Sequence, residues 1–306
     1  MLPTINRSRW VYGVLAASAL LTAACEKPGE ALTDRKAREN EAEITAYIAQ
    51  NNLTATRTED GIYFIQTKTN PSGQLPQQGD EVKYHFITRR LDGTIVDSSD
   101  IAANVPALVN LAGDNTVGIT QGRYEGILRL RQGEEGAVLV PAHLDGRRAG
   151  SLLLPQYLPV RYDLRILSVR TEEQQIEEYI KNNAVAVTSK DDNGLRVAVT
   201  QSRPDSAAIT TGKTVTLNYT GRRAADGTIF DGLYTTTTRQ IQIGARSVPL
   251  GLENGLTKLK AGEKAIIIFP AALGYSTTGL RDQSTGAYTI LPNNPLVYEV
   301  TIVKVQ

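Results

Sequence analysis

The chain has 306 residues, of which 41% are hydrophobic, and its 33 basic and 32 acidic residues leave a formal charge of +1. This length and apolar content are enough for about two soluble domains, each with a core of its own. No nucleic-acid partner is expected, because nucleic-acid-binding proteins present clustered basic surfaces and the sequence has no such cluster.

The N-terminal segment, residues 1–24, has the order of a secretory signal peptide. Arg7 and Arg9 precede an apolar run from Trp10 to Leu21, and small residues follow. The run is shorter than the roughly 20 residues that a membrane-spanning helix needs. The pattern therefore predicts export and removal of the segment.

Cys25, the only cysteine, follows this segment directly. A lone cysteine forms no internal disulfide, so in an exported protein it needs another role. The stretch LTAAC resembles a bacterial lipoprotein signal, which implies a lipid on Cys25 that attaches the protein to a membrane. An ordinary signal peptide that ends near a cysteine is the alternative. The polar residues 25–42 are expected to be a tether, and the expected location is the outer membrane, facing the periplasm.

Residues 43–170 and 171–306 repeat one another and predict two domains of one kind. D-G-T-I-V-D starts at Asp92 and D-G-T-I-F-D at Asp226, and several flanking stretches match in the same order. Each unit opens with a charged helical pattern, ARENEAEITAYI and then TEEQQIEEYIK. We expect these two helices to be solvated linkers that space the domains.

After its leading helix, each unit changes to strand patterns. TVTLNYTG alternates apolar and polar residues, and AIIIFP and LVYEVTIVKV are β-branched runs. Between them, Leu252, Leu256 and Leu259 share one face of a short helix. The predicted class is α+β: in each domain, one short helix packs across a curved antiparallel sheet.

The second unit resembles an FKBP-type peptidyl-prolyl isomerase from about residue 193 to residue 306. Six motifs of that family follow in order, namely VTLNYTG, DGTIFDG, VPLGLENGL, AGEKAIIIFP, LGYSTTG and ILPNNPLVYEV. Residues 61–170 show the same order more weakly. The resemblance implies cis-trans isomerisation of X-Pro bonds, with proline-containing polypeptides as partners and with neither cofactor nor metal.

The resemblance also implies a proline pocket in the second unit. Asp231 is expected at its rim, and Tyr275 is expected to present its hydroxyl to the substrate carbonyl. The residues expected to form the walls and floor are Tyr219, Phe230, Val248, Leu252, Ile290 and Tyr298.

Two positions depart from the family pattern. Leu252 stands where the family has a tryptophan, and Pro249 stands where the family has a residue whose backbone N–H donates to the ligand. Proline has no such N–H. The expected isomerase activity is therefore modest, and a non-catalytic binding or chaperone lipoprotein is the rival hypothesis.

The first unit has different residues at the pocket positions. Phe86, Val96, Arg123 and Asp145 correspond there to Tyr219, Phe230, Leu252 and Tyr275 of the second unit. An arginine in place of the apolar floor makes a poor proline pocket. We therefore expect the first unit to be catalytically silent.

Overall fold

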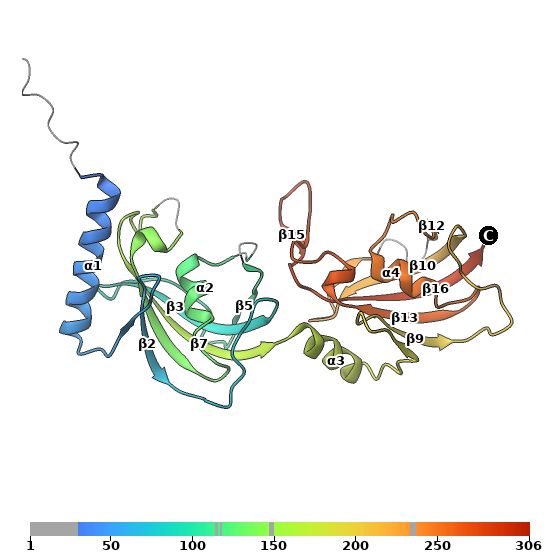
Figure 1. The fold of residues 1–306 in the computed structure, drawn as a ribbon, viewed down its shortest axis with the longest axis horizontal. Helices are drawn as coiled ribbons and strands as arrows, with labels where there is room; N and C mark the ends of the chain where they lie inside the picture. The colour runs from blue at the N-terminus through green and yellow to red at the C-terminus, as the bar shows by residue number, and fades with distance from the viewer. Residues whose placement is uncertain (1–29, 114–115, 117, 147–149, 233–236) are drawn as a thin grey trace, which may run out of the picture.

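The computed structural model describes residues 30–306 apart from 114–115, 117, 147–149 and 233–236. Two antiparallel sheets follow one another along the chain, and the helix α3 lies between them (Figure 1). The predicted signal peptide and Cys25 lie outside the described residues. Within the described part, no helix is long and apolar enough to cross a bilayer.

The first domain contains one sheet in the order β1-β2-β6-β7-β3-β4, with β5 paired to β3. Neighbouring strands are antiparallel throughout. Its elements are α1 (Leu32–Gln50), β1 (Thr56–Arg57), β2 (Tyr63–Lys68), β3 (Glu81–Arg90), β4 (Ile95–Ser98), β5 (Ala107–Asn110), α2 (Gln121–Ile127), β6 (Glu135–Val140), η2 (Ala142–Leu144) and β7 (Val160–Arg170).

The second domain repeats this order as β8-β9-β13-β16-β10-β11, with β12 paired to β10, and adds a small β14–β15 hairpin. Its elements are α3 (Glu172–Asn182), β8 (Ser189–Lys190), β9 (Arg196–Gln201), β10 (Thr214–Arg223), β11 (Ile229–Asp231), β12 (Arg239–Gln242), α4 (Leu250–Leu256), β13 (Lys264–Phe269), η3 (Ala271–Leu273), β14 (Leu280–Arg281), β15 (Tyr288–Ile290) and β16 (Leu296–Val305).

The two domains have a β-bulge at the same place in the sheet. In β3 the pairing with β4 shifts between Thr88 and Arg89, and in β10 the pairing with β11 shifts between Gly221 and Arg222. Counting from these bulges pairs Phe86 with Tyr219 in the two domains. The predicted fold class, two tandem domains of α+β type, is confirmed.

One short helix packs across each sheet, and glycines allow the close approach. In α4, a Cβ atom on Gly251 would lie 2.2 Å from the Phe269 ring, and one on Gly255 would lie 2.4 Å from Ile267. No side chain fits at such distances, so glycine is required at both positions. Leu252, Leu256 and Leu259 are all buried in the core, but α4 ends at Leu256, so the prediction that Leu259 shares the face of this helix is wrong.

The leading helices dock on their own domains. In α1, the Asn40 Oδ1 accepts a hydrogen bond of 2.9 Å from the Ala142 N–H, and in α3 the Glu172 carboxylate accepts one from the Ala271 N–H. Ala142 and Ala271 follow the ends of β6 and β13 in the same way. The expectation that the two helices are solvated linkers is therefore wrong.

The predicted tether, residues 25–42, needs a correction for the same reason. Helix α1 begins at Leu32, so most of this segment is helical. Asn40 is 3% exposed, and its amide also donates to the Tyr157 carbonyl at 2.9 Å. These contacts make residues from Leu32 onward part of the first domain.

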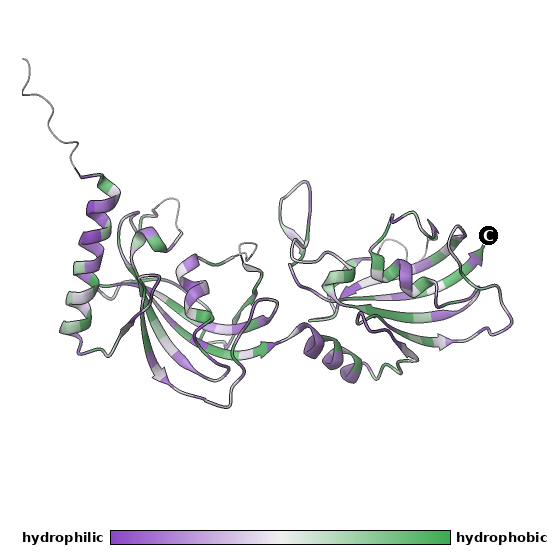
Figure 2. Ribbon diagram, in the orientation of Figure 1, coloured by the Kyte–Doolittle hydropathy of each residue, from purple (hydrophilic) through white to green (hydrophobic). Residues whose placement is uncertain are grey.

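The outer surfaces of α1 and α3 remain hydrophilic, while hydrophobic and hydrophilic residues alternate along the strands (Figure 2). This alternation is the period of strands that bury one face. Each sheet has its main apolar cluster on the side of the short helix and a smaller one under the leading helix. The candidate pocket lies within the main cluster of the second domain.

Candidate functional site

The predicted pocket residues come together in the second domain although they lie on five helices and strands and in two loops. Tyr219 lies on β10, Phe230 and Asp231 on β11, Leu252 on α4 and Tyr298 on β16. Ile290 ends β15, and Val248 and Tyr275 lie in loops beside them. All except Asp231 belong to or pack against one apolar cluster. Four form its buried part, and three surround them at the surface: Tyr219, Leu252, Ile290 and Tyr298 are at most 2% exposed, whereas Phe230, Val248 and Tyr275 are half-buried.

Tyr298 is the centre of the aromatic contacts. The Phe230 ring meets it edge-on, with centroids 5.7 Å apart and planes at 83°. The Phe269 ring stacks on it at 5.8 Å and 10°, and the Tyr219 ring lies 5.5 Å away. Each separation is in the range of favourable aromatic pairs. The arrangement makes a rigid apolar wall.

Gly221 gives the Phe230 ring its place. A Cβ atom on Gly221 would lie 2.8 Å from the Phe230 Cζ and 3.1 Å from the Tyr298 ring. Because real Cβ atoms do not approach carbon so closely, any larger residue here pushes the ring away. The Y-T-G sequence thus specifies the space that the aromatic ring of the neighbouring strand fills.

A polar chain borders this wall. The Arg239 Nη1 donates to the Tyr219 hydroxyl at 2.8 Å, and that hydroxyl donates to the Asp231 Oδ2 at 2.8 Å. Arg239 also donates to the Ser247 carbonyl at 3.3 Å, beside Val248. The second carboxylate oxygen, Asp231 Oδ1, is buried and has no hydrogen-bond partner among the described residues. Within the described part of the chain, Asp231 Oδ1 is therefore an acceptor without a partner at the rim of the site.

Burial keeps the tyrosine hydroxyls of the site neutral. It is the largest cause that raises the pKa of Tyr219, Tyr275 and Tyr298 above the ordinary value of 10.0. The nearby Asp231 carboxylate raises all three further, because a second negative charge beside it is unfavourable. Tyr275 is thus a neutral hydroxyl donor at physiological pH.

The loop before α4 forms the outer edge of the site. A depression of about 530 Å³ opens here, lined by Arg246, Ser247, Val248, Pro249, Leu250, Glu253, Gly274 and Tyr275. Pro249 is the residue that caps α4, and it has neither a side-chain cap nor an N–H to offer a ligand. Polar recognition at this edge therefore depends on side chains such as Tyr275.

The corresponding place in the first domain is filled. The Arg123 guanidinium lies 4.0 Å from the centroid of the Phe86 ring and 5.6 Å from that of Tyr162. The Tyr162 hydroxyl donates to Asp145 at 2.8 Å and accepts from Thr120 at 2.8 Å. A charged side chain that is 9% exposed thus occupies the position of Leu252.

Three further residues contribute to the second-domain site, and the sequence did not single them out. Phe269 lies in the β-branched run AIIIFP, where it looks like ordinary core. Arg239 follows a segment without any motif, and Gly221 looks like a turn glycine. Only the bulge between Gly221 and Arg222 would have indicated the special role of this glycine.

No group of three or more metal-ligating side chains gathers anywhere among the described residues. The site itself is an apolar cluster with hydroxyl, carboxylate and guanidinium groups at its edge.

Comparison with known proteins finds relatives of one family. The family model for FKBP-type peptidyl-prolyl cis-trans isomerases matches residues 205–303. The chain is 26% identical over 234 residues to peptidyl-prolyl cis-trans isomerase FKBP9 of Homo sapiens, covering 74% of this chain and 36% of the human protein. The crystal structure of the three FKBP domains of wheat FKBP73 is 20% identical, covers 83% of this chain and 99% of that chain, and has a TM-score of 0.38.

The chain thus spans about a third of the length of its FKBP9 relative. A shorter relative, FK506-binding protein 2 of Candida glabrata, is 32% identical over 125 residues, covering 40% of this chain and 87% of the fungal protein. A match at this identity over most of a relative's length establishes common family. The chain belongs to the FKBP-type peptidyl-prolyl cis-trans isomerase family.

Proposed function

We propose that the protein is a peptidyl-prolyl cis-trans isomerase whose catalysis takes place in the second domain. The observation that carries this proposal is the aromatic wall of Tyr219, Phe230 and Tyr298 above the buried Leu252, which only the second domain has. Membership of the isomerase family supports the reaction, and the filled pocket of the first domain supports its location.

The reaction makes modest chemical demands. An X-Pro bond rotates over a barrier of roughly 18–20 kcal/mol because the amide is resonance-stabilised. The twisted amide has lost much of its charge separation, so it depends less on water than the planar amide does. A dry apolar cup therefore favours the twisted form, and no nucleophile is needed.

Each residue of the site has a role in this mechanism. The substrate proline ring packs against Phe230 and Tyr298 over Leu252, with Val248 and Ile290 as side walls. Outside the ring, the Tyr275 hydroxyl donates to a substrate carbonyl. The Asp231 Oδ1, which has no partner among the described residues, accepts a substrate N–H.

A second candidate function is a binding module that holds proline-containing chains without isomerising them. Pro249 favours it, because the backbone donor expected at that position is missing. A lost hydrogen bond of this kind is worth about 0.5–1.5 kcal/mol, so substrate binding weakens by up to about tenfold while the apolar cup remains. We therefore rank catalysis first.

NMR exchange spectroscopy on short X-Pro peptides decides between the two functions. The wild-type protein is expected to accelerate cis-trans exchange, and Phe230→Ala is expected to remove most of the acceleration. Acceleration that survives in Phe230→Ala would place catalysis elsewhere. Peptide binding without acceleration in the wild type would favour the binding module.

The proposed setting is the bacterial cell envelope, with proteins that fold there as substrates. Its support is the lipoprotein-like stretch that ends at Cys25, which would carry the lipid. Fractionation of cells that produce Cys25→Ser tests the anchor: the variant is expected in the soluble fraction, while the wild type is expected with the outer membrane. A Cys25→Ser variant that stays with the membrane would refute a lipid on this cysteine.

A further inference from the structure

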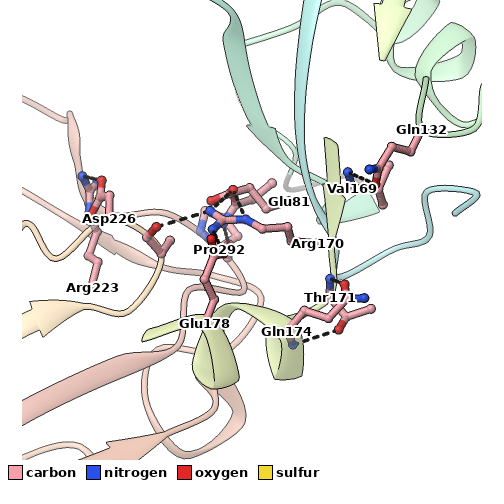
Figure 3. Close-up of polar contacts among 12 residues, drawn as sticks. Glu81, Gln132, Val169, Arg170, Thr171, Gln174, Glu178, Arg223, Asp226 and Pro292 are labelled. Atoms are coloured by element: carbon pink, nitrogen blue, oxygen red, sulfur yellow. Dashed lines mark hydrogen bonds and ion pairs between the residues drawn. The ribbon is translucent and has the colours of Figure 1, made fainter. Parts of the chain in front are cut away.

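The first domain touches the second at helix α3 and at two segments that flank the candidate pocket. One is the loop between Ile290 of β15 and Leu296 of β16, and the other is the turn between β10 and β11. The close-up in Figure 3 shows both, with Arg170 in the middle. Chain connectivity leaves little slack here, since β7 ends at Arg170 and Thr171 already caps α3.

The contact with the first segment is a reciprocal pair of amide hydrogen bonds. The Asn110 Nδ2, at the end of β5, donates to the Pro292 carbonyl at 2.8 Å, and the Asn293 Nδ2 donates to the Leu111 carbonyl at 3.1 Å. Asn110 is 4% exposed, and its Oδ1 has no partner in the described part of the chain. The buried amide of Asn110 thus serves as a donor across the domain boundary.

The loop that Asn110 holds is tied directly to pocket residues. The Asn293 N–H donates to the Ser276 carbonyl at 2.9 Å, next to Tyr275. A Cβ atom on Gly279 would lie 2.5 Å from the Ile290 carbonyl, so the hairpin packs on this loop without spare room. A shift of the loop therefore moves both Tyr275 and Ile290.

The contact with the second segment goes through Arg170. This guanidinium binds Glu81, which is 1% exposed, and reaches the Glu178 carboxylate at 2.5 Å and the Ala225 carbonyl at 3.3 Å. Ala225 lies in the turn that leads from β10 to Phe230 and Asp231.

One hydrogen bond joins the two held segments. The Ala224 N–H donates to the Pro295 carbonyl at 2.9 Å. The first domain thus contacts a connected frame that includes the turn before Phe230 and the loop after Ile290. A displacement of one of these segments moves the other, because close-packed protein interiors have low compressibility.

We propose that Asn110 is a positioning residue for the proline pocket, and that the silent domain is retained because it holds the pocket frame of the second domain. This inference rests on the proposed isomerase function. The first domain binds no substrate. It acts on the pocket of the second domain through the Asn110–Pro292 hydrogen bond, and Arg170 holds the neighbouring turn.

The test uses the mature chain with both domains. In Asn110→Ala the donor is lost, and the kcat/KM for X-Pro exchange is expected to fall by about threefold to tenfold, the effect of one buried hydrogen bond. Asn110→Asp keeps the shape of the side chain but lacks the N–H, and it provides the result if the alanine variant does not fold. Gln242→Ala is the matched control, since Gln242 has the place of Asn110 in the second sheet and lies on β12.

A second readout does not need activity. The methyl NMR signals of Ile290 and the ring signals of Tyr275 are expected to shift in the Asn110 variants and to stay unchanged in Gln242→Ala. Unchanged signals together with unchanged kcat/KM would overturn the positioning role. Shifted signals in a protein whose wild type does not accelerate exchange would support positioning and refute the isomerase function.

Discussion

The two domains share a backbone plan and differ in the residues that decide whether a pocket exists. Thr88 and Gly221 occupy the same place beside the same bulge, each opposite an aspartate of the neighbouring strand. In the second domain the glycine makes room for Phe230. In the first domain a threonine stands at the position of this glycine, and the smaller Val96 stands at the position of Phe230. The two positions therefore differ together between the domains.

The pocket floor differs in the same coordinated way. Leu252 is fully buried among aromatic rings, whereas Arg123 lies over the Phe86 ring and next to Tyr162, whose hydroxyl donates to Asp145. A cation over an aromatic face is stabilised by the quadrupole of the ring. In the first domain, Arg123, Tyr162 and Asp145 form a polar cluster at the place of the apolar pocket.

The largest expected effect comes from giving the second domain the arginine of the first. Leu252→Arg puts a charge into the apolar cluster without the environment that accommodates Arg123. The free energy of unfolding of the second domain, measured by chemical denaturation, is expected to fall by more than about 3 kcal/mol. Its counterpart, Arg123→Leu, is expected to leave the second domain's stability unchanged. Equal stability of Leu252→Arg and wild type would show that the two floors are interchangeable.

The next effect concerns catalysis. Phe230→Val gives the second pocket the residue of the first and removes the edge-on contact with Tyr298. The rate of X-Pro exchange is expected to fall by about tenfold or more, which corresponds to about 1.4 kcal/mol of transition-state stabilisation. Val96→Ala is the matched control and is expected to exchange peptides like the wild type. A larger loss in Val96→Ala than in Phe230→Val would move the active site to the first domain.

A smaller effect is expected at the shared bulge. Gly221→Ala introduces a Cβ atom that displaces Phe230, and overpacking of this kind costs about 1–3 kcal/mol. Denaturation and peptide exchange are both expected to show the loss. Thr88→Ala, at the same place in the first domain, removes a hydroxyl oxygen that has no partner among the described residues, so its cost is expected to be lower. The reverse order of the two costs would contradict the packing argument.

No pH effect on catalysis is expected from the tyrosines of the site up to pH 10. Burial raises the pKa of Tyr219, Tyr275 and Tyr298 above 10.0, the value expected in the unfolded chain. A raised pKa means that their contribution to stability is complete below pH 10 and is lost only as the pH rises through the raised values. Exchange rates measured at increasing pH are expected to stay level in this range. A fall that Tyr275→Phe abolishes would show that its hydroxyl ionises earlier.

Much of this architecture could be predicted from the sequence. The repeat of D-G-T-I-x-D predicts the correspondence between the domains, and strand alternation with the spacing of Leu252 and Leu256 predicts a sheet with one helix. These signals succeed because each depends on residues close together in the chain. Glycine-mediated packing, as at Gly251 against Phe269, depends on the distance between two elements, which no local pattern contains.

The leading helices show why part of the fold was missed. α1 is rich in charged residues, and some of the contacts that dock it, such as Asn40 with Ala142, join segments more than a hundred residues apart. Charge alone therefore suggested a tether and solvated linkers. The bond between Asn110 and Pro292 was hidden for the same reason, since an isolated asparagine at the end of a short strand carries no motif.

Methyl NMR of the full chain during titration with an X-Pro peptide shows which domain receives the proline ring. Binding in the second domain alone is expected to shift the methyl signals of Leu252, Val248 and Ile290 progressively, while those of Val96, Val140 and Leu164 in the first domain stay in place. Shifts in the first domain that equal or exceed those in the second would refute a proline site confined to the second domain.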